Sequence, residues 1–131
     1  NQSLALGFEK SVEGISYADV HFDDEMQKIW EAAFLEEFSG LWGLPEEVLK
    51  VFYKYLSNGA GHKIGGYPDF AQYDPREDDN FHDTLLLQIE SEWNEQYSVM
   101  FGDAGVANFF INREDLVHCK FDDVLYNWDC S

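Results

Sequence analysis

The sequence HKIGGYP at residues 62–68 has the most distinctive spacing in the chain. Gly65 and Gly66 come just before an aromatic-Pro step, and paired glycines let a backbone pass close to another group. One interpretation is a ligand-binding loop with His62 or Lys63 at its edge. The other, which we favour, is a tight bulge where the chain enters a sheet. The run lacks the GxGxxG and GKS/T patterns, so it does not predict a phosphate site.

Further polar residues lie beside apolar or glycine-rich runs. Gln72 and Gln88 stand next to apolar segments, and a buried glutamine must find hydrogen-bond partners for its amide. Each could bond to backbone at a sheet edge, or both could point into one polar cleft. Asp103 lies in the glycine-flanked sequence GDAG, where aspartate is ordinary turn chemistry. The candidate ligand-binding residues are therefore His62, Gly65, Gly66, Gln72, Gln88 and Asp103.

Other kinds of site find little support in the sequence. The four histidines have no i, i+4 pair, so a zinc site of the HExxH type is not predicted. The acidic segment at residues 74–83 lacks the ligand spacing of an EF-hand loop. Ser98 and Cys119 are nucleophile candidates without a surrounding signature. We therefore predict no metal, no cofactor and no identifiable catalytic residue, and we expect Cys119 and Cys130 to be free, buried thiols.

Composition and charge narrow the functional classes. The 131 residues carry 8 basic and 26 acidic side chains, which gives a formal net charge of −18. This charge argues against binding to duplex nucleic acid or to an anionic membrane. No apolar run is long enough to predict a membrane span. The aromatic content of 17% argues against disorder and indicates a single folded domain over residues 1–131.

Two amphipathic helices are predicted in the first half. The first begins at a cap formed by Asp23 or Asp24, extends through Phe38 and ends at Ser39-Gly40. The second begins with Pro45, extends to about residue 56 and ends at Asn58-Gly59. Its apolar face is wide, so it could be buried on two sides. A short half-buried strand is predicted at residues 4–8.

The second half has a β-like pattern. Residues 84–89 are apolar on both faces, as in a central strand, and residues 97–101 and 106–111 read as a hairpin. We also expect a solvated loop at residues 74–80, a helical turn at residues 113–117 capped by Asn112, and a last strand at residues 124–128. The predicted fold class is α+β: a mainly antiparallel sheet with the two N-terminal-half helices packed on one face. The residues expected to be largely buried are Trp30, Phe34, Phe38, Phe52, Leu56, Leu86 and Phe109.

Taken together, several of these runs resemble a known family. They are HKIGGYP at 62–68, Gln72, LLLQI at 85–89, FGDAGVANFFI at 101–111 and VLYNWDC at 124–130. Their order and spacing over residues 60–130 are similar to those of the C-terminal half of the YwqG-like bacterial proteins, a family of unknown function. The predicted strand at residues 4–8 also fits that family.

The resemblance carries expectations but no catalytic residue. Family members are about twice this length and carry a related pattern in each half, so the resemblance implies that this chain is the C-terminal half of a longer cytoplasmic protein. An orphaned face of such a half would be apolar, and we expect self-association through it.

Three functions remain open from the sequence. The leading prediction is a non-enzymatic binding or interaction module with a protein or small-molecule partner. The first alternative is an acidic, immunity-type inhibitor that masks a basic toxin or nuclease. The second is an enzyme that acts on a small ligand in a cleft near Gly65-Gly66.

Overall fold

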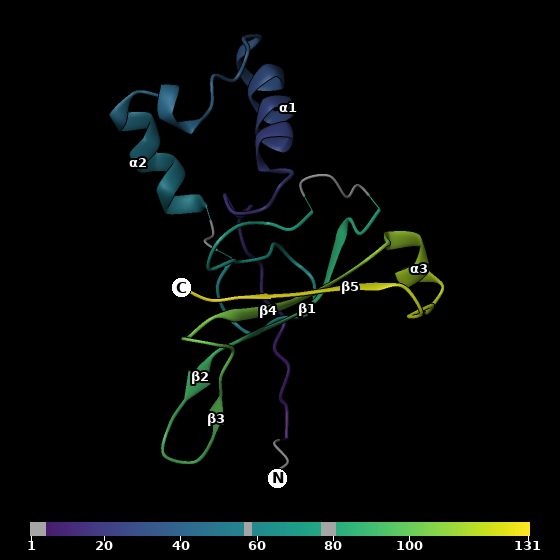
Figure 1. The fold of residues 1–131 in the computed structure, drawn as a ribbon. Coiled ribbons are helices and arrows are strands. Elements are labelled where there is room, and N and C mark those ends of the chain that lie inside the picture. The colour runs from purple at the N-terminus through teal and green to yellow at the C-terminus, as the bar shows by residue number, and fades with distance from the viewer. Residues whose placement is uncertain (1–4, 57–58, 77–80) are drawn as a thin grey trace.

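The protein has an α+β fold built on a small antiparallel sheet (Figure 1). The computed structural model describes residues 5–56, 59–76 and 81–131. In chain order the elements are α1 (Phe22–Phe34), the 3-10 helix η1 (Leu41–Gly43), α2 (Glu46–Tyr55), β1 (Thr84–Glu90), β2 (Glu92–Trp93), β3 (Ser98–Val99), β4 (Val106–Ile111), α3 (Arg113–Val117) and β5 (Val124–Asp129). The predicted fold class is confirmed. Among these elements, no helix is both long and apolar enough to cross a bilayer.

The sheet has the strand order β1-β4-β5, with all neighbours antiparallel. β4 is therefore its central strand, and the prediction that residues 84–89 occupy the centre is wrong. The predicted hairpin between residues 97–101 and 106–111 is also wrong, because β3 pairs with β2 in a separate two-stranded ribbon. The turn at residues 101–105 does form, and Gly105 N donates to Phe101 O at 2.8 Å. It redirects the chain into β4 without pairing β4 with β3.

The strand register separates two different faces of the sheet. On one face, Gln88, Asn108 and Asn127 form a cross-strand row of amides. Glu90, Val106 and Asp129 form the next row on that face. On the opposite face, aromatic and aliphatic side chains lie in register, and the rings of Phe109 and Tyr126 approach to 4.8 Å between centroids. The face with the amides also carries Phe110, and residues 59–76 cover it through hydrogen bonds to Gln88 and Asn108 and through Arg76, which stacks over Phe110.

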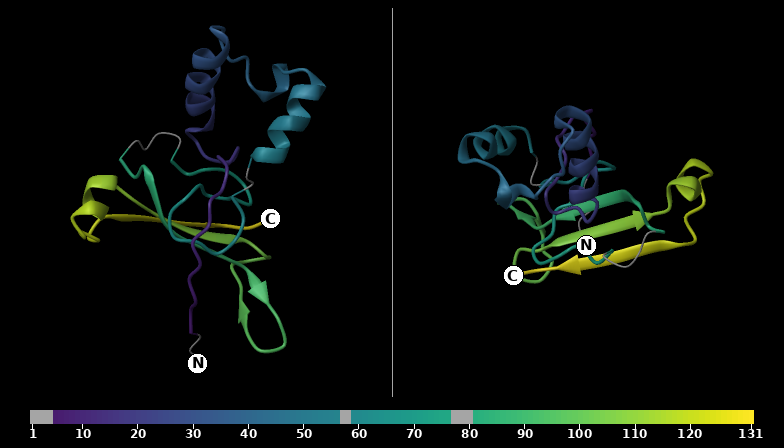
Figure 2. Two further views of the ribbon diagram at one scale, coloured as in Figure 1. Left: turned by 180° about the vertical axis from the view of Figure 1, so that it is seen from behind. Right: turned by 90° about the horizontal axis from the view of Figure 1, so that it is seen from above.

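The helices form a second, smaller cluster on one side of the sheet. Phe22, Met26, Phe38 and Leu44 are buried together, and Trp30, Phe52 and other partly buried side chains pack against them. Residues 59–76 run between this helical part and the strands (Figures 1 and 2). The cluster is small because α1 and its connection to α2 supply all of its buried residues, with residues of α2 and Ile15 of the preceding segment packed against them. Its limited size explains why several apolar residues of α1 and α2 stay exposed.

Several sequence predictions for the first half need correction. α1 ends at Phe34, since Leu35 adopts a left-handed conformation (φ 57°), four residues before the predicted end. Phe34 is 58% exposed rather than buried, because the last turn of α1 extends beyond the cluster. α2 is not buried on two sides. It ends at Tyr55, because Leu56 is already extended, so the predicted stop at Asn58-Gly59 does not end it; Asn58 itself lies outside the described residues.

The N-terminal segment also differs from its prediction. Residues 5–10 form no strand, and Leu6 and Phe8 are largely exposed, while Leu4 lies outside the described residues. Alternation of apolar and polar residues is not enough here because no strand edge pairs with this segment. Both cysteines are free as predicted, but Cys119 is exposed rather than buried.

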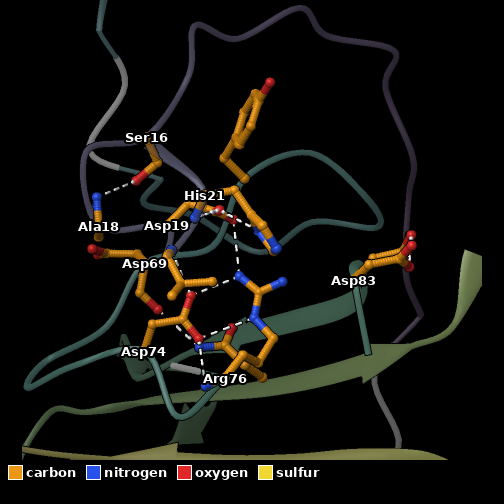
Figure 3. Close-up of polar contacts among 12 residues, drawn as sticks. Ser16, Ala18, Asp19, His21, Asp69, Asp74, Arg76 and Asp83 are labelled. Carbon is orange, nitrogen blue, oxygen red and sulfur yellow. Dashed lines mark hydrogen bonds and ion pairs between the residues drawn. The ribbon is translucent and has the colours of Figure 1, made fainter. Parts of the chain in front are cut away.

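A buried arginine joins the helical part to the sheet. The Arg76 side chain, 1% exposed, lies between the carboxylates of Asp19 and Asp74 (Figure 3). Its Nη2 is 2.9 Å from Asp19 Oδ2 and 2.6 Å from Asp74 Oδ2, and its Nε is 3.0 Å from Asp74 Oδ1. Its guanidinium stacks over Phe110 of β4, 4.1 Å from the ring centroid. The prediction that residues 74–80 form a solvated loop is thus wrong for Asp74 and Arg76, and residues 77–80 lie outside the described part.

This ion cluster yields a stability prediction. We expect Arg76→Ala to lower the free energy of unfolding by about 3–5 kcal/mol, because two buried carboxylates would lose their counter-charge. Urea denaturation followed by circular dichroism measures the change. Arg113→Ala, at an exposed position on α3, is the matched control and should change stability by less than about 0.5 kcal/mol. Equal effects of the two substitutions would contradict this role for Arg76.

Candidate functional site

The buried amide of Gln88 fixes residues 59–76, which we call the covering loop, onto the sheet. Its Nε2 donates to the carbonyl oxygens of Gly59 and Gly61, at 2.8 and 2.9 Å, and its Oε1 accepts from Asp69 N at 2.8 Å. The backbone of Gln88 exchanges both hydrogen bonds with Lys63. A single β1 residue therefore holds residues 59–69 through side chain and backbone alike.

Asn108 of β4 fixes the same loop at Asp69, the residue that Gln88 also binds. Its Nδ2 donates to Asp69 O at 2.8 Å, so the two cross-strand amides bind the backbone of Asp69 from both sides. Asn108 is fully buried, and its Oδ1 has no hydrogen-bond partner among the described residues. A buried acceptor without a partner costs stability, about 1–3 kcal/mol. The loop is thus held rigidly at Asp69, at an energetic cost.

An acidic pocket lies beside this anchored residue. It has a cavity volume of about 400 Å³ and is lined by Ala60, Asp69, Phe70, Ala71, Glu90, Ser91, Ala104, Gly105, Val106 and Ser131. The covering loop supplies one wall, the end of β1 and the start of β4 supply the floor, and the turn before β4 supplies the rim. We call this cavity the acidic pocket. The ionisable side chains among the described residues of its lining are carboxylates, and none of these residues is basic.

Burial governs the electrostatics of the acidic pocket. Desolvation raises the pKa of the Asp69 carboxyl above its ordinary value, and the nearby carboxylates of Glu90 and Asp129 raise it further. A hydrogen bond from the Phe70 backbone and the charge of Lys63 only partly offset this pKa shift. A cation entering the pocket would therefore interact with a carboxylate that is poorly solvated and repelled by its neighbours.

The other polar side chains around the acidic pocket form hydrogen bonds with backbone groups. Glu90 Oε1 accepts from Gly61 N at 2.7 Å, and Asp129 accepts from the backbone N–H groups of Ala71 and Gln72. Ser91 Oγ donates to Gly105 O at 2.7 Å and accepts from Phe101 N at 2.9 Å. Ser91 thus holds the turn in place, and none of these contacts supplies it with a base that could activate it as a nucleophile.

Three of the predicted site residues adjoin the acidic pocket without lining it. Gln88 accepts a hydrogen bond from the backbone N–H of Asp69. The His62 ring accepts from Glu90 N at 3.1 Å through Nδ1 and contacts Glu92 Oε2 at 2.9 Å through Nε2. The Gln72 side chain donates to Cys130 O at 2.7 Å. Gln72 and Gln88 therefore bond to different segments of backbone and do not share one cleft.

The other predicted residues lie elsewhere. Asp103 is exposed in the turn at residues 101–105. The two residues that follow it in this turn, Ala104 and Gly105, line the acidic pocket. Gly65 and Gly66 have positive φ angles, and a Cβ at Gly66 would overlap the Glu13 carboxylate. That carboxylate also accepts from Tyr67 N and, at 2.7 Å, from Lys63 Nζ. Gly66 thus accommodates Glu13, a Cβ at Gly65 would meet no neighbour, and neither glycine lines the acidic pocket.

Sequence reasoning did not single out Asp69 and Glu90, the two carboxylates of the pocket. Each directly follows a distinctive sequence motif: Asp69 comes after HKIGGYP, and Glu90 comes after LLLQI. Their shared position depends on the loop folding back over β1, which no local pattern encodes. Among the described residues, no group of three or more His, Cys, Asp or Glu side chains is arranged to hold a metal ion.

The raised pKa of Asp69 yields a pH prediction. Because the carboxyl binds its proton more tightly in the folded than in the unfolded chain, this group makes stability fall as pH rises from the unfolded pKa through the folded pKa. We therefore expect Asp69→Asn to be more stable than the wild type at pH 7, and the difference to shrink as the pH falls below both pKa values. Thermal denaturation between pH 3 and pH 7 measures this; Asp103→Asn is the control, and a destabilised Asp69→Asn variant at pH 7 would contradict the prediction.

Comparison with known proteins adds the family. The model of a family described as "Domain of unknown function (DUF1963)" matches residues 1–130. A search of curated proteins found no match. The match covers the helical part, the covering loop and the sheet. All the residues that line the acidic pocket except Ser131 therefore lie within the matched region. The chain belongs to the DUF1963 family.

Proposed function

We propose that this protein is a non-enzymatic binding module whose acidic pocket receives a cationic group of its partner. The observation that carries the proposal is the position of Asp69, a carboxyl with a raised pKa in a cavity that also holds Glu90. A bound ammonium or guanidinium group would relieve the repulsion between these carboxylates. The repulsion between these carboxylates destabilises the free protein, and its relief on binding would contribute to the binding free energy.

The charge of the whole chain supports a cationic partner. Two of the eight basic side chains, Lys63 and Arg76, are mostly buried in ion pairs with Glu13, Asp19 and Asp74, so the remaining 6 basic and 23 acidic side chains still carry a formal charge of 6 − 23 = −17. A net charge of −18 attracts cations over a long range and accelerates their association. The pocket then supplies the short-range contact that a diffuse surface charge lacks.

Two broader assignments go with this proposal. The YwqG-like resemblance of residues 60–130 supports assigning the protein to that group within its family, together with a cytoplasmic location. Self-association through the apolar face of the sheet is a further proposal, supported by the exposure of Tyr126 (50%) and Trp128 (48%) on β5.

The two alternative functions make different demands. An inhibitor of a basic toxin or nuclease is favoured by the acidic surface, and its binding would depend on many exposed acids rather than on Asp69. An enzyme acting near Gly65-Gly66 is less favoured, because Glu13 fills the space beside Gly66 and the hydroxyl of Ser91 is held by backbone groups. A general acid or base at Asp69 is the form of catalysis that its raised pKa would suit.

Binding of a simple amine tests the proposed function. We expect propylammonium, at low ionic strength and pH 7, to shift the backbone NMR signals of Asp69, Ala71, Glu90 and Gly105, while 1-propanol does not. Asp69→Asn should weaken binding about tenfold, because one charge-assisted hydrogen bond to a charged group is lost. Binding should strengthen as pH rises through the pKa of Asp69, since the ionised form is the one that attracts the cation.

Asp103→Asn removes an equal charge from an exposed turn and is the matched control. Equal weakening by Asp69→Asn and Asp103→Asn would indicate surface attraction alone and would favour the inhibitor. Identical responses to propylammonium and 1-propanol would refute a cation site in the acidic pocket.

A further inference from the structure

A second cavity lies in the helical part, far along the chain from the acidic pocket. It has a volume of about 550 Å³, and its lining includes Tyr17, Phe22, Asp23, Leu41, Trp42 and Tyr53. We call it the aromatic groove. Tyr17 and Tyr53 are each about half exposed, and Trp42 is 91% exposed. Large aromatic side chains thus remain open to solvent around a cavity of a size typical for small-molecule ligands.

Four segments build the aromatic groove. Tyr17 comes from the turn before α1, Phe22 and Asp23 open α1, Trp42 belongs to η1, and Tyr53 comes from α2. Phe22 is also part of the buried cluster, so the floor of the groove is continuous with the helical core. The walls therefore rest on packed elements rather than on a free loop.

The chemistry of the lining is aromatic with one acidic group. The faces of Tyr and Trp rings attract cations, and quaternary ammonium groups are bound in proteins by clusters of such rings. Asp23 adds a negative charge, Asp24 and Glu25 follow it in the first turn of α1, and no basic side chain lines the groove. The lining thus complements a ligand that is both cationic and apolar at its surface.

We propose that the aromatic groove binds the trimethylammonium group of a small molecule. Methyl groups spread the positive charge and let it leave water easily, whereas a primary ammonium group is strongly hydrated. The proposal goes beyond the proposed function: it concerns a different cavity, and it stands or falls independently of Asp69.

Choline and its uncharged carbon isostere, 3,3-dimethylbutan-1-ol, test this proposal. They have nearly the same shape, so a difference in binding reports the charge. We expect isothermal titration calorimetry to show binding of choline but not of the isostere, and the indole N–H signal of Trp42 to shift in NMR spectra. Trp42→Leu should weaken choline binding about tenfold, because one cation–π contact is lost. Asp23→Asn should weaken it as well, whereas Tyr53→Phe keeps the ring and should bind like the wild type.

Trp93→Leu is the matched control, because Trp93 is also well exposed, at 64%, but lies in the β2-β3 ribbon. It should leave choline binding unchanged. Urea denaturation of each variant shows whether it remains folded, and the exposure of Trp42 makes a folded Trp42→Leu variant the expected result. Equal binding of choline and the isostere would overturn the proposal in favour of an apolar groove. Binding of a trimethyllysine peptide without binding of choline would overturn the small-molecule source.

Discussion

The placement of Arg76 is the constraint on which the rest of the structure depends. Its guanidinium binds Asp19, just before α1, and Asp74, in the covering loop, and it stacks on Phe110 in the central strand. Burial lowers the pKa of Arg76, but the two carboxylates outweigh this, so its pKa stays above the ordinary value and the group stays charged. A permanently charged group with two buried partners fixes its three segments in one arrangement, because each partner left alone would be an uncompensated charge.

The amides of Gln88 and Asn108 continue this arrangement toward the acidic pocket. They bind the backbone N–H and C=O of Asp69, so they fix the point from which its carboxyl extends beside the acidic pocket. The raised pKa of Asp69 reduces stability, and so does the Oδ1 of Asn108, which has no hydrogen-bond partner within residues 5–56, 59–76 and 81–131; the two groups are neighbours, because Asn108 Nδ2 donates to Asp69 O. Stability is commonly sacrificed where a protein must present a reactive or binding group. This coincidence distinguishes the acidic pocket from the exposed carboxylates elsewhere on the surface.

Local sequence signals predicted the local elements well and the long-range ones poorly. The cap at Asn112, the strand at residues 84–89 and the last strand follow from short patterns, and all three are present. The pairing of β3 with β2, the exposure of Phe34 and the burial of Arg76 depend on which distant segments meet. An arginine among acidic residues in a turn-rich run looks solvated until Asp19 and Phe110 are known to lie beside it. For the same reason, the sequence indicated the neighbourhood of the acidic pocket through Gln88 and His62 but not its carboxylates.

The central claim is that the fold holds the partly buried carboxyl of Asp69 in an acidic cavity that a cation can occupy. Titration of the Asp69 side-chain carboxyl by ¹³C NMR, with and without saturating propylammonium, tests this claim most directly. The account predicts a pKa above the usual aspartate range in the free protein and a lower pKa when the amine is bound, because a bound cation favours the ionised form. An ordinary pKa in the free protein, or a pKa that the amine leaves unchanged, would contradict it.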